Sequence, residues 1–184
     1  MATSFETQLT ELIPSLRAFA FVRTRHRQEG EDLVQDTMVR ALGSRHQFQP
    51  GTNLKAWLFT IMRNLHIDSV RQRKREAVTD MDDDDVRDLR VAGASQFDHL
   101  VLKELGVVIG RLQDGQREAL MLVVANGLSY EEAAEICKCP VGTIRSRLAR
   151  GRRYLEDAMM GREPPAANAA NLDKGIRRDR RLSV

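Results

Sequence analysis

The chain has 184 residues, of which 42% are hydrophobic and only 5% aromatic, so we expect one or two small domains with aliphatic, helical cores. The formal net charge is +3 at pH 7, but the charges are unevenly distributed along the chain. Because no apolar run approaches the ~20 residues of a membrane span and the N-terminus does not resemble a signal peptide, we expect a cytoplasmic protein that does not contact membranes.

Two amphipathic helices are predicted at the start of the chain. Apolar residues recur at helical spacing from Leu9 to Ala20, and Pro14 within this pattern either kinks the helix or lies in its first turn. A second apolar stripe runs from Leu33 to Leu42. The opposite face of this second helix is rich in acidic and amide side chains, a pattern that is either solvated or suited to a protein partner.

A third helix is predicted after a loop at residues 48–53. Thr52 or Asn53 at the end of this loop can cap the helix by accepting hydrogen bonds from its first free N–H groups. The helix carries Trp57 on its inward face and continues into a basic cluster at residues 71–75. Such a cluster is either a phosphate-binding surface or a solvated helix end.

The composition divides the chain into four parts. We predict a first domain over residues 1–75, a flexible acidic linker over 76–97, a second domain over 98–160 and a disordered basic tail over 161–184. In the second domain, Asp114 is expected to cap a helix. No strand-like alternation is present, so the predicted fold class is all-α with two small helical domains.

A helix, a tight turn and a second helix are predicted within the second domain. Gly127 can end the preceding helix in a left-handed conformation, and Ser129 with Glu132 forms an S-x-x-E capping box. Pro140 and Gly142 are expected to form the turn. The second helix turns five arginines outward: Arg145, Arg147, Arg150, Arg152 and Arg153. This pattern is typical of a helix-turn-helix that enters the DNA major groove, although a basic helix in an ordinary bundle would share it.

The chain contains two cysteines, Cys137 and Cys139, which are too few for a disulfide framework. We expect Cys137 in the core and Cys139 in the turn. The four histidines lie far from both cysteines in sequence, so we predict no metal site and no cofactor. Without a phosphate-binding loop or a paired nucleophile and base, an enzyme is not expected.

Four segments resemble bacterial extracytoplasmic-function (ECF) sigma factors, the small group IV sigma subunits of RNA polymerase. The segments are residues 31–37, 48–64, 116–120 and 127–148. The start of the chain, from Phe5 to Ala20, further resembles the EcfG-type general-stress subgroup. The resemblance implies a sigma-2-like helical bundle followed by a sigma-4-like four-helix domain with the helix-turn-helix.

For the first domain, the resemblance implies two contact surfaces. Asp32, Gln35 and Asp36 would bind the β′ clamp of core RNA polymerase. The −10 promoter element would be read, with one base flipped out, by amide and basic side chains: Asn53, Arg63, Asn64, Arg71, Arg73, Lys74 and Arg75. Capping of the third helix explains Asn53 equally well.

For the second domain, the resemblance implies contact with the β flap of the polymerase and with the −35 promoter element as duplex. The implied DNA-binding residues are Thr143, Arg145, Ser146, Arg147 and Arg150. The acidic linker would thread through the polymerase or serve only as a tether. An anti-sigma factor, NepR-type within the EcfG subgroup, would hold the free subunit inactive.

The sequence therefore predicts a sigma factor that binds core RNA polymerase and directs promoter-specific transcription initiation in a stress response. One alternative is a sigma-like adaptor that sequesters an anti-sigma regulator, but the basic residues at both DNA surfaces argue against it. The other is a stand-alone helix-turn-helix regulator. Residues 1–75 lack the alternating strands and helices of the sensing domain that such a regulator would need.

Overall fold

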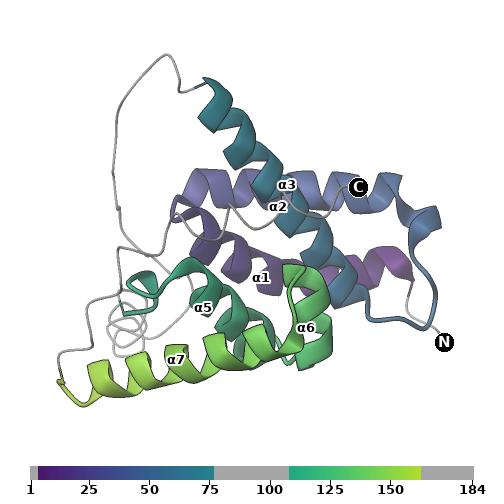
Figure 1. Ribbon diagram of the computed structural model, residues 1–184. Coiled ribbons are helices and arrows are strands. Elements are labelled where there is room, and N and C mark those ends of the chain that lie inside the picture. Colours follow the sequence, from purple (N-terminus) through teal and green to yellow (C-terminus); the bar gives the residue numbers. More distant parts are fainter. Residues whose placement is uncertain (1–3, 77–107, 163–184) are drawn as a thin grey trace, which may run out of the picture.

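The structure, a computed structural model, describes residues 4–76 and 108–162 as two groups of helices (Figure 1). The first group contains α1 (Phe5–Thr24), α2 (Arg27–Gly43), the 3-10 turn η1 (Arg45–Gln47) and α3 (Leu54–Glu76). The second contains α5 (Asp114–Ala119), the π-helical turn η2 (Leu120–Ala125), α6 (Tyr130–Cys137) and α7 (Val141–Met159). The all-α prediction with two helical domains is confirmed. Residues 77–97 of the predicted linker and 163–184 of the predicted tail lie outside the described residues.

Helix α1 begins earlier than its apolar pattern suggests. The Ser4 hydroxyl caps it by accepting a hydrogen bond from the Thr7 N–H at 3.2 Å. Pro14 consequently lies well inside the helix, so the alternative that places it in the first turn is wrong. Leu9 and Leu16, one on either side of Pro14 in sequence, are both buried, as the spacing predicts.

Helix α3 is capped by Asn53, one of the two predicted residues. The Asn53 side-chain oxygen accepts hydrogen bonds from the N–H groups of Lys55 and Ala56 at 3.1 and 3.3 Å. Phe59 is fully buried, with its ring centroid 4.9 Å from that of Phe19 on α1. Trp57 is only half-buried and packs against Phe5 and Phe48, in agreement with a packing role.

Helix α5 begins one residue earlier than predicted. Gln113 is its N-cap, and Asp114 lies in the first turn, so the prediction that Asp114 caps the helix is wrong. The helix then widens into the π-turn η2, in which the consecutive residues Leu120, Met121 and Leu122 are all buried. Helical periodicity predicts apolar residues every three or four positions and does not anticipate this wider turn.

The helix-turn-helix forms largely as predicted. Gly127 adopts a φ of 69°, and the Ser129–Glu132 capping box opens α6 with both reciprocal hydrogen bonds present. The left-handed residue of the turn is Lys138, with a φ of 50°, whereas Gly142 lies within α7. The N–H of the next residue, Cys139, bonds to a carbonyl five positions back, as in a Schellman ending that satisfies the last free carbonyls of α6.

The two helix groups pack directly against each other. Helix α6 contacts α3, and α5 contacts α1, while α7 packs on α5 and α6. In Figure 1, α5 and α6 consequently lie between the first three helices and α7. This arrangement determines which of the predicted contact surfaces are covered.

Candidate nucleic-acid interface

The exposed face of α7 carries most of the predicted major-groove residues. Arg145, Ser146 and Arg150 are exposed, and Thr143 is half-buried in the first turn. The Arg150 guanidinium donates to the Ser146 carbonyl at 3.1 Å and to its hydroxyl at 3.2 Å. The Arg145 guanidinium lies over the Tyr130 ring, 5.8 Å from its centroid, a cation–π contact that orients the arginine beside α6.

Arg147 departs from the predicted outward orientation because it is half-buried against α5. Its Nη1 lies 3.8 Å from the Cys139 sulfur. Its Nε would lie only 2.8 Å from a Cβ on Gly115, so the absence of a side chain at Gly115 makes room for the guanidinium. Arg145, Arg150, Arg152 and Arg153 are exposed, as predicted.

The cysteines occupy the predicted places. Cys137 is buried, and burial raises the pKa of its thiol to about 12, so this cysteine is a neutral core residue at physiological pH. Cys139 is half-buried in the turn. Within residues 4–76 and 108–162, no group of three or more histidine, cysteine or acidic side chains is arranged to hold a metal ion.

The predicted −10 residues at the end of α3 are partly free and partly paired. Arg71 and Arg75 are exposed, whereas Arg73 forms a 2.9 Å ion pair with Glu29 of α2. Asn64 is half-buried. The side chain of the remaining residue in this cluster, Lys74, lies outside the described part of the chain.

The remaining two predicted −10 residues contact the second domain. The Asn53 amide donates to the Glu132 carboxylate at 2.6 Å. Arg63 donates through Nε to Glu118 at 2.9 Å and through Nη2 to the Cys137 carbonyl at 3.1 Å. In this arrangement, the donors of Asn53 and Arg63 are occupied by protein rather than presented to a ligand.

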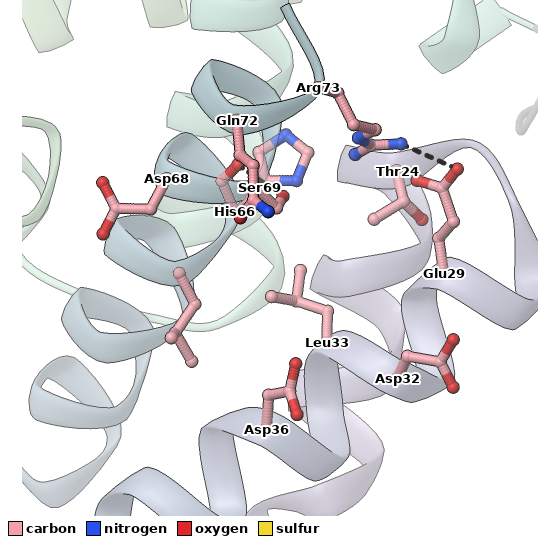
Figure 2. Close-up of a pocket in the computed structure, with 11 residues that line it drawn as sticks. Thr24, Glu29, Asp32, Leu33, Asp36, His66, Asp68, Ser69, Gln72 and Arg73 are labelled. Carbon is pink, nitrogen blue, oxygen red and sulfur yellow. Dashed lines mark hydrogen bonds and ion pairs between the residues drawn. The ribbon is translucent and has the colours of Figure 1, made fainter. Parts of the chain in front are cut away.

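The predicted polymerase-binding residues lie on α2 beside a groove. Asp32, Gln35 and Asp36 are all exposed, and the Asp32 carboxylate accepts a hydrogen bond from Gln28 at 3.0 Å. Asp32 and Asp36 line a groove of about 430 Å³ between α2 and the C-terminal half of α3 (Figure 2). Gln35 is not among the residues that line it.

His66 on α3 lies in the wall of the same groove (Figure 2). The pKa of its imidazole is lowered to about 4, mainly by burial and also by the positive charges of Arg23 and Arg73. Glu118 and Glu29 act in the opposite direction but do not compensate. His66 is therefore neutral at physiological pH.

Comparison with known protein families identifies the family to which the chain belongs. The profile of Sigma-70 region 2 matches residues 9–76, and that of Sigma-70, region 4 matches residues 102–155. The chain belongs to the sigma-70 family. It is a sigma factor, a subunit that binds core RNA polymerase and directs transcription from promoters. The helix-turn-helix therefore belongs to region 4, and the first three helices to region 2.

Relatives of this sigma factor include ECF sigma factors. It is 45% identical over 155 residues to the ECF RNA polymerase sigma factor EcfG of Rhodopseudomonas palustris (strain TIE-1), with 84% of each chain covered. It is 40% identical over 135 residues to the ECF RNA polymerase sigma factor SigC of Mycobacterium tuberculosis (strain CDC 1551 / Oshkosh), covering 68% of this chain and 67% of SigC.

Two solved structures resemble the sigma factor as a whole. The sigma factor RpoE in complex with the anti-sigma factor NepR from Bartonella quintana is 40% identical, with a TM-score of 0.75, covering 85% of this chain and 96% of that one. CnrH in complex with the cytosolic domain of CnrY is 25% identical, with a TM-score of 0.62, covering 86% of this chain and 89% of that one. No helix in the described ranges is both long and apolar enough to cross a bilayer.

Three residues at the contact between the domains were not predicted to have a functional role. Glu118, Glu132 and Arg23 form interdomain contacts that join positions far apart in sequence. Glu132 was predicted only as part of a capping box, and it performs that role as well. No local sequence signal singles out Glu118, because it ends the polar run at residues 114–118 that precedes the apolar residues of the helix.

Proposed function

We propose that this sigma factor divides promoter recognition between its two domains. Residues 1–75 would read the −10 element as opened DNA, through the side chains of Asn53, Arg63 and Asn64 and the basic end of α3. Residues 98–160 would bind the −35 element as duplex through α7 and contact the β flap. The sigma factor performs no covalent chemistry itself and acts in the cytoplasm with the polymerase.

The observation that best supports this division is the exposed set of Arg145, Ser146 and Arg150 on α7, the second helix of the helix-turn-helix. An N-terminal segment of such a helix lies nearest to the base edges in the major groove. Arginine is the residue best suited to bind guanine through two hydrogen bonds. We propose that Thr143 in the first turn contacts a phosphate. Arg147 would have to leave its position against α5 before binding DNA.

Asp32, Gln35 and Asp36 are our candidates for the contact with the β′ clamp. Their exposure on one helix, beside a groove with apolar and polar lining, supports a surface for a protein partner. Carboxylates on such a surface would pair with basic side chains of the polymerase. We also propose a stress-response role and a NepR-type anti-sigma partner, supported by the similarity to EcfG and to the RpoE–NepR complex.

Reconstituted transcription tests the assignment of the −35 surface. Purified sigma factor and sigma-free core enzyme would transcribe a promoter library, and sequencing of the transcripts would define the preferred −35 element. Arg145→Ala and Arg150→Ala should each lower transcription from that promoter by roughly tenfold, since one bidentate arginine–guanine pair contributes about 1–3 kcal/mol of discrimination.

Arg152→Ala is the matched control, because Arg152 is also exposed on α7 but lies outside the proposed set. Binding to core enzyme should be unchanged in all three variants. Equal use of intact and scrambled −35 elements by the wild-type protein would contradict the assignment.

A further inference from the structure

In the contact between the domains, the hydrogen-bond donors and cations lie on the first domain and the acceptors on the second. Arg23, Arg25, Asn53, Lys55 and Arg63 of the first domain act as hydrogen-bond donors or cations. Their partners on the second domain are carboxylates and main-chain carbonyls: Asp114, Glu118, Asn126, Glu132 and Cys137. Each of these contacts therefore places a positive or donor group of the first domain against a negative or acceptor group of the second.

The centre of this contact is the carboxylate of Glu118, which is only 4% exposed. One of its oxygens lies 2.9 Å from Arg63 Nε and the other 3.3 Å from Arg23 Nη1. The Nε of Arg23 is buried without a hydrogen-bond partner. Two arginines thus share one carboxylate, and one of their donors is unsatisfied, which leaves the closed contact imperfect and easier to open.

A second part of the contact lies at the start of α3. The Asn53 amide donates to Glu132 at 2.6 Å, while its oxygen caps the helix. The Lys55 ammonium donates to the Asn126 carbonyl at 2.9 Å. The edge that would approach an unpaired base is therefore covered by the N-terminal end of α6.

The donors covered in this way have the chemistry of a nucleic-acid site, since arginine, lysine and amide groups bind phosphates and base edges. We propose that the acceptor face of the second domain imitates opened promoter DNA, so that it and the −10 strand compete for the same donors of the first domain. The free sigma factor is then self-closed. This inference rests on the proposed −10 role of the first domain.

The test uses two doubly substituted full-length proteins with the same loss of charge. Glu118→Gln with Glu132→Gln removes two of the three carboxylate charges that face the first domain and leaves only the more distant Asp114. Glutamine at position 132 still suits a capping box. Glu131→Gln with Glu135→Gln is the control, because both glutamates are exposed on the same helix as Glu132. Circular dichroism verifies that both proteins retain the helical content of the wild type.

Two measurements without polymerase decide the question. Small-angle X-ray scattering reports domain separation, and fluorescence anisotropy reports binding to a labelled, mixed-sequence single-stranded DNA. The Glu118/Glu132 variant should be more extended and bind the DNA about tenfold more tightly than the control, a size typical of coupled equilibria. Equal affinities, or tighter binding without extension, would overturn the inference.

Scattering and DNA binding taken together separate this inference from the proposed function. If the assignment of the −10 surface is wrong, the Glu118/Glu132 variant will extend in solution but gain no affinity for single-stranded DNA. If the domains are open in the wild type, its scattering will already match that of the variant. If the free sigma factor is self-closed, the variant will be more extended and will also bind single-stranded DNA more tightly. Promoter-specific transcription will be preserved once core enzyme is added.

Discussion

Arg117 shows how one buried charge can organise the start of the second domain. Its side chain is 4% exposed and donates to the carbonyls of Ile109, Gly110 and Leu112 and to the Asp114 carboxylate. The carbonyls belong to the end of the short helical segment before α5 and to the connection that follows it, where main-chain groups commonly lack helical partners. The Ile109 carbonyl also accepts a hydrogen bond from the Leu112 N–H at 3.1 Å. The arginine therefore replaces the solvent that this segment has lost.

Replacement of Arg117 by alanine should destabilise the protein strongly. Three main-chain carbonyls would lose a charged donor, so we expect the free energy of unfolding to fall by about 3 kcal/mol, as for other buried polar groups left unsatisfied. Urea denaturation measures the change. Arg111→Ala, at an exposed position in the same segment, should have an effect within about 0.5 kcal/mol, and comparable losses in both variants would contradict this role.

His66 gives the folded protein a pH dependence of predictable sign. Its pKa is about 4 in the folded state, well below the ordinary histidine value of 6.5, so the unfolded chain binds the proton more readily. Stability from this group is complete above pH 6.5 and is lost as the pH falls toward 4. Between pH 6.5 and 4, the thermal unfolding temperature of His66→Gln should fall less steeply than that of the wild type. If the two unfolding temperatures fall in parallel, His66 is not the source of the pH dependence.

At the scale of elements, the close contact between α7 and η2 depends on Gly151. A Cβ at this position would lie 2.8 Å from Leu120 Cδ1 and 3.3 Å from its Cγ, although Leu120 is itself buried. Alanine normally stabilises a helix relative to glycine by up to about 1 kcal/mol. Here the packing conflict opposes that gain, because a buried side chain has little room to move.

We therefore predict opposite outcomes for two Gly→Ala changes in α7. Gly151→Ala should lower the free energy of unfolding by about 1–3 kcal/mol, the usual cost of an overpacked core. Gly142→Ala, where the added Cβ would meet no packed neighbour within 4 Å beyond the adjacent backbone of its own helix, should be neutral or slightly stabilising. Chemical denaturation of both variants tests the comparison, and a stabilising Gly151→Ala would mean that Leu120 relaxes freely.

The elements that the sequence predicted well are those with a local signal. The capping box at Ser129 and Glu132, the left-handed Gly127 and the Asn53 cap each depend on neighbouring residues. The turn at Lys138 was missed because a left-handed lysine has no sequence signature when glycine and proline lie nearby. The π-turn was missed because its apolar residues also fit an ordinary helix.

At the scale of the whole molecule, the contact between domains could not be predicted from sequence. Arg63 and Glu118 are 55 positions apart, and no local pattern reports that they meet. The sequence suggests candidate nucleic-acid-binding residues in each domain, but it gives no indication that the first domain's donors are covered by the second. The roles of these residues in reading DNA stay predictions, and the donors of the first domain are covered while the two domains are in contact.

Asn53→Asp separates the capping role of this residue from its interdomain role. Aspartate caps a helix as well as asparagine does, so α3 should keep its stability. The new carboxylate would face Glu132 across the 2.6 Å contact, and repulsion between the two charges should weaken the closed state by on the order of 1 kcal/mol.

Small-angle scattering should therefore show a larger radius of gyration for Asn53→Asp, while circular dichroism shows unchanged helix content. Asn64→Asp is the control, since it adds the same charge at a half-buried position on α3, the helix that Asn53 caps. Because surface charges are screened by salt, the extension caused by Asn53→Asp should shrink as ionic strength rises. An extension that is independent of salt, or equal in both variants, would show that repulsion from Glu132 is not its cause.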